Sequence, residues 1–156
     1  GQPVWFVRGE PPAIFACAAP FRIAIADSGA TGPTRAMVDQ VRARRAADPA
    51  RYDRWFDEIG EIVQAARQAL EAGQPVELGP LFDRNQALLA QIGVSTPALE
   101  RLMAAARAAG AGGAKLSGAG GGGNIIALVE DEAVGPVRAA LLAAGAKRVL
   151  VTTVAA

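Results

Sequence analysis

Apolar residues follow two different periods along the chain, and together these predict strands near both ends with helices between them. Short apolar runs typical of β-strands occupy residues 4–7, 21–27, 114–117, 124–129 and 148–154. We expect the first two runs to be buried on at least one face. Apolar residues at helical spacing predict helices over residues 33–48, 52–70, 78–92, 97–109 and 134–144.

The ends of these helices carry recognisable signals. Thr96 is expected to cap the fourth helix with Pro97 in its first turn, and Gly145 to end the last one. The helix over 52–70 has the clearest apolar stripe, which includes Trp55 and Phe56. Aromatic residues on such a stripe usually pack inside the protein, so we expect both to be core residues and not a ligand platform.

Strands at both ends with helices clustered between them predict an α+β fold. An antiparallel or mixed sheet with helices on one face suits this order better than a doubly wound sheet. A length of 156 residues is normal for one domain, and we find neither an internal repeat nor an interdomain linker. The chain begins at Gly1 and enters an apolar run almost at once, so we expect it to be part of a longer protein.

Composition excludes several classes of function. Half of the residues are apolar (51%), 20% are charged and the formal net charge is +1, with no apolar stretch of the roughly 18 residues needed to cross a membrane. The cluster of Arg42, Arg44 and Arg45 lacks interleaved aromatic residues, which argues against nucleic acid as a partner. Cys17 is the single cysteine and histidine is absent, so neither a disulfide within the chain nor a histidine zinc site can form. We expect a cytoplasmic protein.

One glycine-rich segment is hard to explain by folding alone. It runs from Lys115 through Ser117 and continues as Gly118-Ala119-Gly120-Gly121-Gly122-Gly123 before Asn124. Consecutive glycines are costly to order, but they let the backbone approach a ligand and turn its N–H groups toward an anion. A flexible hairpin tip is the alternative. Lys115 and Ser117 beside the loop favour a phosphate site.

Two common phosphate loops fit this segment poorly. Gly118, Gly120 and Gly123 match the G-x-G-x-x-G spacing of dinucleotide sites, but that loop should open a helix, whereas a strand is predicted from Asn124. A Walker A loop carries its lysine after the last glycine, whereas Lys115 precedes the loop.

The segment from Lys115 to Gly123 closely resembles the third conserved motif of the GHMP kinases, in the form found in mevalonate kinases. Residues 27–38 resemble the segment that opens the C-terminal domain of those enzymes, and residues 85–89 and 92–99 also match. The resemblance covers nearly the whole chain, with its motifs in the correct order.

The resemblance implies that residues 1–156 form a GHMP kinase C-terminal domain, with a four-stranded antiparallel, ferredoxin-like sheet backed by helices. It implies ATP-dependent phosphorylation of a small alcohol such as mevalonate, at a site between two domains. By resemblance, the phosphate-proximal residues are Ser117, Gly118, Gly120, Gly121, Gly122 and Gly123. Ala119 would line the substrate pocket and Thr34 would lie at the substrate side, although Thr34 could equally be an ordinary helix-start residue.

ATP and Mg²⁺ would be held mainly by the N-terminal domain, which in this family carries the other phosphate loop, the catalytic aspartate and its partner lysine. We therefore expect no catalytic residue in this chain and no turnover by it alone. Its partners would be its own N-terminal domain, the alcohol and ATP, and a second copy could pair with it as a homodimer through the exposed docking face. The alternatives are another enzyme of the family (phosphomevalonate kinase, mevalonate-3-kinase, diphosphomevalonate decarboxylase or homoserine kinase) and a non-catalytic ligand-binding module.

Overall fold

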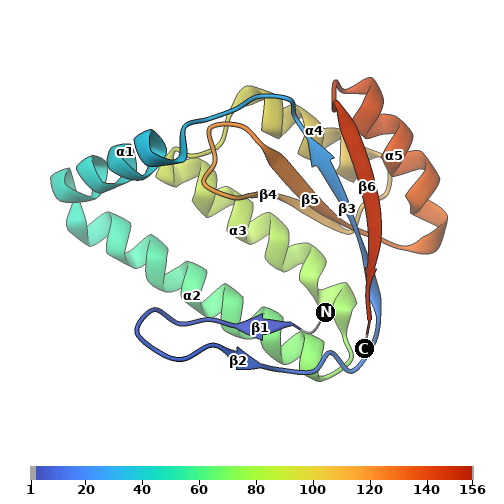
Figure 1. Ribbon diagram of the computed structural model, residues 1–156, viewed down its shortest axis with the longest axis horizontal. Coiled ribbons are helices and arrows are strands. Elements are labelled where there is room, and N and C mark those ends of the chain that lie inside the picture. Colours follow the sequence, from blue (N-terminus) through green and yellow to red (C-terminus); the bar gives the residue numbers. More distant parts are fainter. Residues whose placement is uncertain (1–2, 156) are drawn as a thin grey trace.

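A four-stranded antiparallel sheet forms the centre of the computed structural model, which describes residues 3–155 (Figure 1). Its strands lie in the order β4-β5-β3-β6, with bounds β3 Phe21–Asp27, β4 Gly113–Ser117, β5 Asn124–Val129 and β6 Arg148–Val154. With the helices between β3 and β4 counted as one crossover, the chain order is β-α-β-β-α-β, the split arrangement of ferredoxin-like folds. The predicted α+β class and the antiparallel sheet are confirmed.

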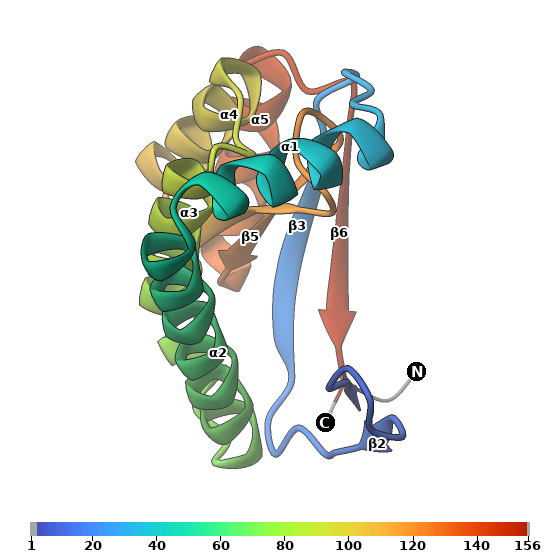
Figure 2. The same ribbon diagram turned by 90° about the vertical axis from the view of Figure 1, so that its left-hand side faces the viewer.

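Helices back one face of this sheet. Their bounds are α1 Thr34–Ala47, α2 Pro49–Glu71, α3 Leu78–Ile92, α4 Pro97–Ala108 and α5 Val134–Ala143, with 3-10 turns η1 Pro75–Glu77 and η2 Asp131–Ala133. The sheet seen from its side has α3, α4 and α5 on one side of β3 and β6, while α2 reaches down and away from the strands (Figure 2). Each of the five predicted helices is present.

Local signals place the start of α4 and the end of α5 as expected, and the start of α1 within one residue. The Thr96 hydroxyl accepts a hydrogen bond from the Leu99 N–H at the start of α4. Gly145, after α5, adopts a positive φ of 104°, a conformation that glycine adopts at little cost. Pro33 stands at the N-cap of α1, one position before its predicted place at the first helical residue.

The core lies between the sheet and helices α4 and α5. Its largest fully buried side chains include Leu99, Met103, Ile125, Val137 and Leu141. The cross-strand register, in which Ala24 pairs with both Ala127 and Val151, places these small and branched residues on the helix side. On the opposite face Ile23, Ile25, Ile126 and Leu150 are half-buried or exposed, whereas Leu128 is buried. The described residues therefore leave most of this apolar face without cover.

The first predicted strand is shorter and more exposed than expected. Val4–Trp5 forms β1, which pairs with the unpredicted strand β2 (Ala13–Ile14) as a separate two-stranded hairpin. Phe6 is 70% exposed, so burial of this run was wrongly predicted. The hairpin is anchored on α2, where the Arg67 guanidinium lies over the Trp5 ring at 4.9 Å from its centroid.

The expectation of two aromatic core residues on α2 is met in part. Trp55 packs against the core beside the buried Tyr52, whose ring centroid is 5.0 Å away in an edge-to-face arrangement. Phe56 is 38% exposed, so its prediction as a core residue was wrong. Each helical residue turns by about 100°, so Phe56 lies on the flank of the stripe while Trp55 and Tyr52 face the core.

Candidate functional site

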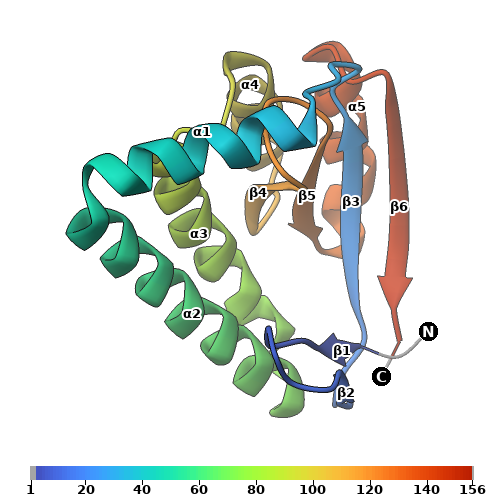
Figure 3. The same cartoon turned by 60° about the vertical axis from the view of Figure 1, so that its left-hand side comes forward.

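Three segments that are distant in the sequence meet at one end of the sheet. The glycine loop (residues 118–123) connects β4 and β5 and lies beside the segment that leads from β3 into α1 (Figures 1 and 3). The Gly123 N–H donates to the Ala30 carbonyl at 2.7 Å, and the Ser28 N–H donates to the Gly123 carbonyl at 2.9 Å. On its other side the Gly121 N–H donates to the carbonyl of Val94, between α3 and α4, at 2.8 Å. The loop is thus held from two sides.

The loop needs glycine for its backbone conformation as well as for space. Its glycines have positive φ throughout: Gly118 (100°), Gly120 (82°), Gly121 (72°), Gly122 (146°) and Gly123 (81°). A Cβ on Gly120 would lie 2.2 Å from the Val94 carbonyl oxygen, and one on Gly122 would lie 2.6 Å from the Ala30 carbonyl oxygen. Such contacts are far shorter than van der Waals distance. The loop is packed against its neighbours, which argues against a free hairpin tip.

An open cleft of about 400 Å³ lies along this loop. Its lining residues are Asp27, Gly29, Ala30, Thr31, Gly32, Thr34, Ser117, Gly118, Ala119, Gly120, Gly122, Gly123 and Asn124. The structure therefore brings together seven of the eight predicted site residues. The exception is Gly121, whose N–H turns inward to Val94 and whose Cβ position faces the Met37 side chain. Asp27, Gly29, Ala30, Thr31 and Gly32 had been singled out only for their family resemblance, without a role.

The cleft presents hydrogen-bond donors with no partner inside the protein. Within residues 3–155 the N–H groups of Gly118, Ala119, Gly120 and Gly122 donate no hydrogen bond. The first turn of α1, which begins at Thr34, also faces the cleft and contains no acidic residue. Free N–H groups at a helix start and in a glycine nest attract anions. This arrangement can hold a phosphoryl or carboxylate group.

Thr34 is free to bind a ligand because it does not cap its own helix. It is the first residue of α1, after the N-cap Pro33, and no side-chain hydrogen bond caps this helix. The residue is exposed on the cleft wall. Its hydroxyl can therefore donate to or accept from a polar group in the cleft.

Lys115 lies apart from the cleft, although its position in sequence had favoured a phosphate site. Its Nζ donates to the Leu116 carbonyl at 2.8 Å, and its side chain lines a separate apolar hollow of about 300 Å³ between α2, α3 and the sheet. Burial lowers the pKa of this ammonium below its ordinary value. The anion-binding capacity of the cleft thus comes from backbone groups and not from this cation.

Asp27 is the one titratable residue among those that line the cleft. Its Oδ1 accepts a hydrogen bond from the Gly29 N–H at 2.8 Å, which closes a tight turn at the end of β3. A single carboxylate used in this way offers little to a divalent cation, which needs several oxygen ligands. No group of three or more metal-ligating His, Cys, Asp or Glu residues occurs within residues 3–155.

The sequence of residues 66–147 matches the model of the family described as GHMP kinases C terminal, which covers just over half of the chain. The chain belongs to the GHMP kinase family. A mevalonate kinase of Pyrococcus horikoshii is 37% identical to this GHMP kinase domain over 111 residues, which are 68% of the chain and 33% of the relative.

Solved structures agree with this family. The L. major mevalonate kinase in complex with R-mevalonate superposes with a TM-score of 0.87 at 30% identity, covering 95% of this GHMP kinase chain and 47% of the other. The Streptococcus pneumoniae phosphomevalonate kinase shares the fold, with a TM-score of 0.76 over 92% of this chain and 44% of its own, at 19% identity. The chain therefore spans about a third to a half of the length of these relatives. The four-stranded sheet with its helices is the GHMP kinase C-terminal fold.

None of the helices described in residues 3–155 is both long enough and apolar enough to span a membrane.

Proposed function

We propose that residues 1–156 form the C-terminal domain of a mevalonate kinase, which transfers a phosphoryl group from ATP to the mevalonate hydroxyl. The observation that carries this proposal is the cleft, where free backbone N–H groups of the glycine loop face Thr34 and the start of α1. The similarity to mevalonate kinases at 37% and 30% identity supports mevalonate as the alcohol.

The cleft residues suit the anionic parts of such a reaction. The N–H groups of Gly118, Ala119 and Gly120 would donate to the phosphoryl oxygens, on which negative charge is spread in the transition state. Ala119 would line the pocket of the alcohol and the Thr34 hydroxyl would bind one of its polar groups. Because these donors are already ordered by the contacts of the loop, little reorganisation is needed during transfer.

A second, N-terminal domain would supply the remaining groups. The relatives are two to three times as long as the matched part of this chain, and the sheet carries a largely uncovered apolar face on which such a domain could dock. ATP and Mg²⁺ would be held mainly by that domain, since the cleft offers Asp27 as its single carboxylate. That domain would also carry the base, so the chain alone would not turn over.

A joined protein, in which the proposed N-terminal domain precedes this chain, should catalyse ATP-dependent phosphorylation of mevalonate, because both walls of the active site would then be present. A coupled ADP-release assay with mevalonate, phosphomevalonate and homoserine as acceptors measures this and ranks the acceptors. The 156-residue chain alone serves as the control and should release no ADP. Absence of transfer to any small alcohol would overturn the proposal, and preference for phosphomevalonate would reassign the substrate within the family.

Thr34→Ala should raise the KM for the alcohol about tenfold in the joined protein, because one hydrogen bond to the substrate is lost. Thr34→Ser keeps the hydroxyl and should stay within about twofold of the unaltered enzyme. Since Thr34 makes no capping bond, the free energy of unfolding should change by less than about 0.5 kcal/mol in either variant. Equal KM values for Thr34→Ala and Thr34→Ser would show that the Thr34 hydroxyl does not bind the alcohol.

A further inference from the structure

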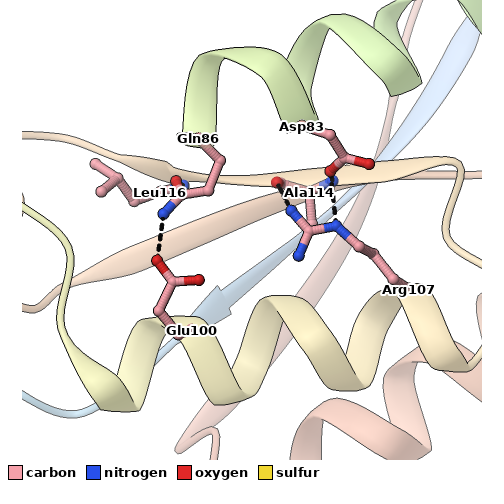
Figure 4. A network of polar contacts seen from close by, with 6 residues as sticks. All are labelled: Asp83, Gln86, Glu100, Arg107, Ala114 and Leu116. Atoms are coloured by element: carbon pink, nitrogen blue, oxygen red, sulfur yellow. Dashed lines mark hydrogen bonds and ion pairs between the residues drawn. The ribbon is translucent and has the colours of Figure 1, made fainter. Parts of the chain in front are cut away.

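Strand β4 lies at the edge of the sheet, yet its outward-facing hydrogen-bonding groups are all occupied by side chains. Successive residues of a strand direct their N–H and C=O groups alternately toward and away from the neighbouring strand, and those of Ala114 and Leu116 point away from β5. The Asp83 carboxylate accepts from the Ala114 N–H at 3.0 Å, and the Arg107 guanidinium donates to the Ala114 carbonyl at 2.7 Å. These side chains come from α3 and α4 and meet at the strand edge (Figure 4).

Leu116 is held in the same way, one residue before Ser117. Its N–H donates to Oε1 of Gln86 at 2.9 Å, and its carbonyl accepts from the Lys115 ammonium at 2.8 Å. Four side chains thus occupy the positions that a neighbouring strand would otherwise fill. Such cover blocks pairing with another chain, and it also fixes β4 against α3 and α4.

Gln86 contacts the surroundings of the glycine loop from two directions. It is 3% exposed, and its Nε2 donates to Glu100 Oε1 at 2.8 Å and to Ser95 Oγ at 3.0 Å. Ser95 follows Val94, whose carbonyl accepts the Gly121 N–H inside the loop. One buried amide therefore connects the strand that enters the loop with the segment on which the loop rests.

We infer that Gln86 is a positioning residue for the phosphate-binding loop, with Glu100 fixing the orientation of its amide. The inference rests on the proposed kinase function only for its catalytic consequence. Loss of the amide would leave the buried Leu116 N–H without a partner. Ser95 would keep only its hydrogen bond to Glu100 Oε1 at 2.6 Å, so the loop would lose its support at β4 and be held less firmly beside Val94. Displacement of about 1 Å in such a site can cost about 100-fold in rate.

Gln86→Leu tests the inference by hydrogen exchange in the 156-residue chain, a measurement that needs no activity. The exchange rates of the Gly121 and Gly123 amides, which both donate inside the site, should rise at least about tenfold relative to the amides of β5. The matched control is Gln91→Leu, the same change at an exposed position of α3, which should leave these rates unchanged. Unchanged loop exchange in Gln86→Leu overturns the inference, whatever the joined enzyme does.

Kinetics of the joined enzyme supply the second measurement. Gln86→Leu should lower kcat about 10- to 100-fold with KM values within about twofold. The reason is that a displaced loop would stabilise the transition state less, while binding of the ground state would change little. A loss confined to thermal stability, with kcat intact below the melting temperature, would show a merely structural role and overturn the inference. An unaltered enzyme without kinase activity would count against the proposed function alone, because the exchange measurement stands by itself.

Two further variants, in which the amide and carboxylate of Gln86 and Glu100 are changed and then swapped, keep the test decisive if Gln86→Leu fails to fold. Gln86→Glu keeps an acceptor for Leu116 but places a carboxylate against Glu100, so it should speed loop exchange through repulsion. The double variant Gln86→Glu/Glu100→Gln restores one amide and one carboxylate at this contact and should return loop exchange to within about threefold of the unaltered chain. Equal exchange in the single and double variants would exclude the contact with Glu100 from the inference.

Discussion

Gly120→Ala should lower the free energy of unfolding by about 3 kcal/mol and the kcat of the joined enzyme by at least about 100-fold. The residue has a φ of +82°, which costs an alanine about 1–2 kcal/mol. Its new Cβ would also lie 2.2 Å from the Val94 carbonyl oxygen, a backbone atom that cannot turn aside as a side chain can. Urea denaturation of the chain and steady-state kinetics of the joined enzyme measure the two effects.

Gly118→Ala is the matched control within the same loop. Gly118 also has a positive φ, of 100°, but a Cβ there would meet nothing within 4 Å. Its variant should therefore lose only the conformational part, about 1 kcal/mol. Equal losses in the two variants would mean that the close approach to Val94 does not hold the loop.

Gly79→Ala should destabilise the chain by about 3 kcal/mol or prevent its folding, although alanine favours helices by about 1 kcal/mol over glycine. Gly79 is a buried residue of α3, and its Cβ would lie 2.2 Å from the Gly112 carbonyl oxygen. In the reverse direction, a Cβ on Gly113 would lie 2.0 Å from the Gly79 carbonyl oxygen. The backbones of α3 and β4 therefore touch at this point, and the helix cannot move away without pulling Asp83 and Gln86 from the strand.

The control for this second change is Gly60→Ala on α2, where a Cβ would meet nothing within 4 Å. There the helical preference acts alone and should stabilise the chain by about 1 kcal/mol. Thermal and urea unfolding of both variants should give opposite signs. A stabilising Gly79→Ala would contradict the close backbone contact between α3 and β4.

Much of the candidate site was predictable because its residues lie in a short stretch of unusual composition. Five glycines between two apolar runs indicated a loop with special backbone conformations, and each of these glycines has a positive φ. Thr34 was placed by resemblance, and the structure brings it to the same cleft. Lys115 had favoured a phosphate site by its place in sequence, but its side chain lies in the apolar hollow away from the cleft, which Ser117 lines.

The residues that support the site gave no signal of this kind. Asp83, Gln86 and Arg107 look like ordinary polar residues of helices, and their role depends on which strand edge those helices meet. Gly79 lay within the predicted helix over 78–92, and nothing in its neighbourhood in the sequence indicated its close contact with β4. The hairpin of β1 and β2 was also missed, since two-residue strands leave no periodic pattern.

By itself the sequence determined the five helices, the four strands of the main sheet, the α+β class and the glycine loop, because apolar period, capping residues and glycine runs are local signals. The tertiary structure alone decided which N–H groups of that loop remain free. Gly121 and Gly123 donate to carbonyls of Val94 and Ala30, which lie more than twenty residues away in sequence. The neighbouring groups are thereby left to face the cleft. Hydrogen bonds between distant segments depend on packing, and packing has no local signature in the chain.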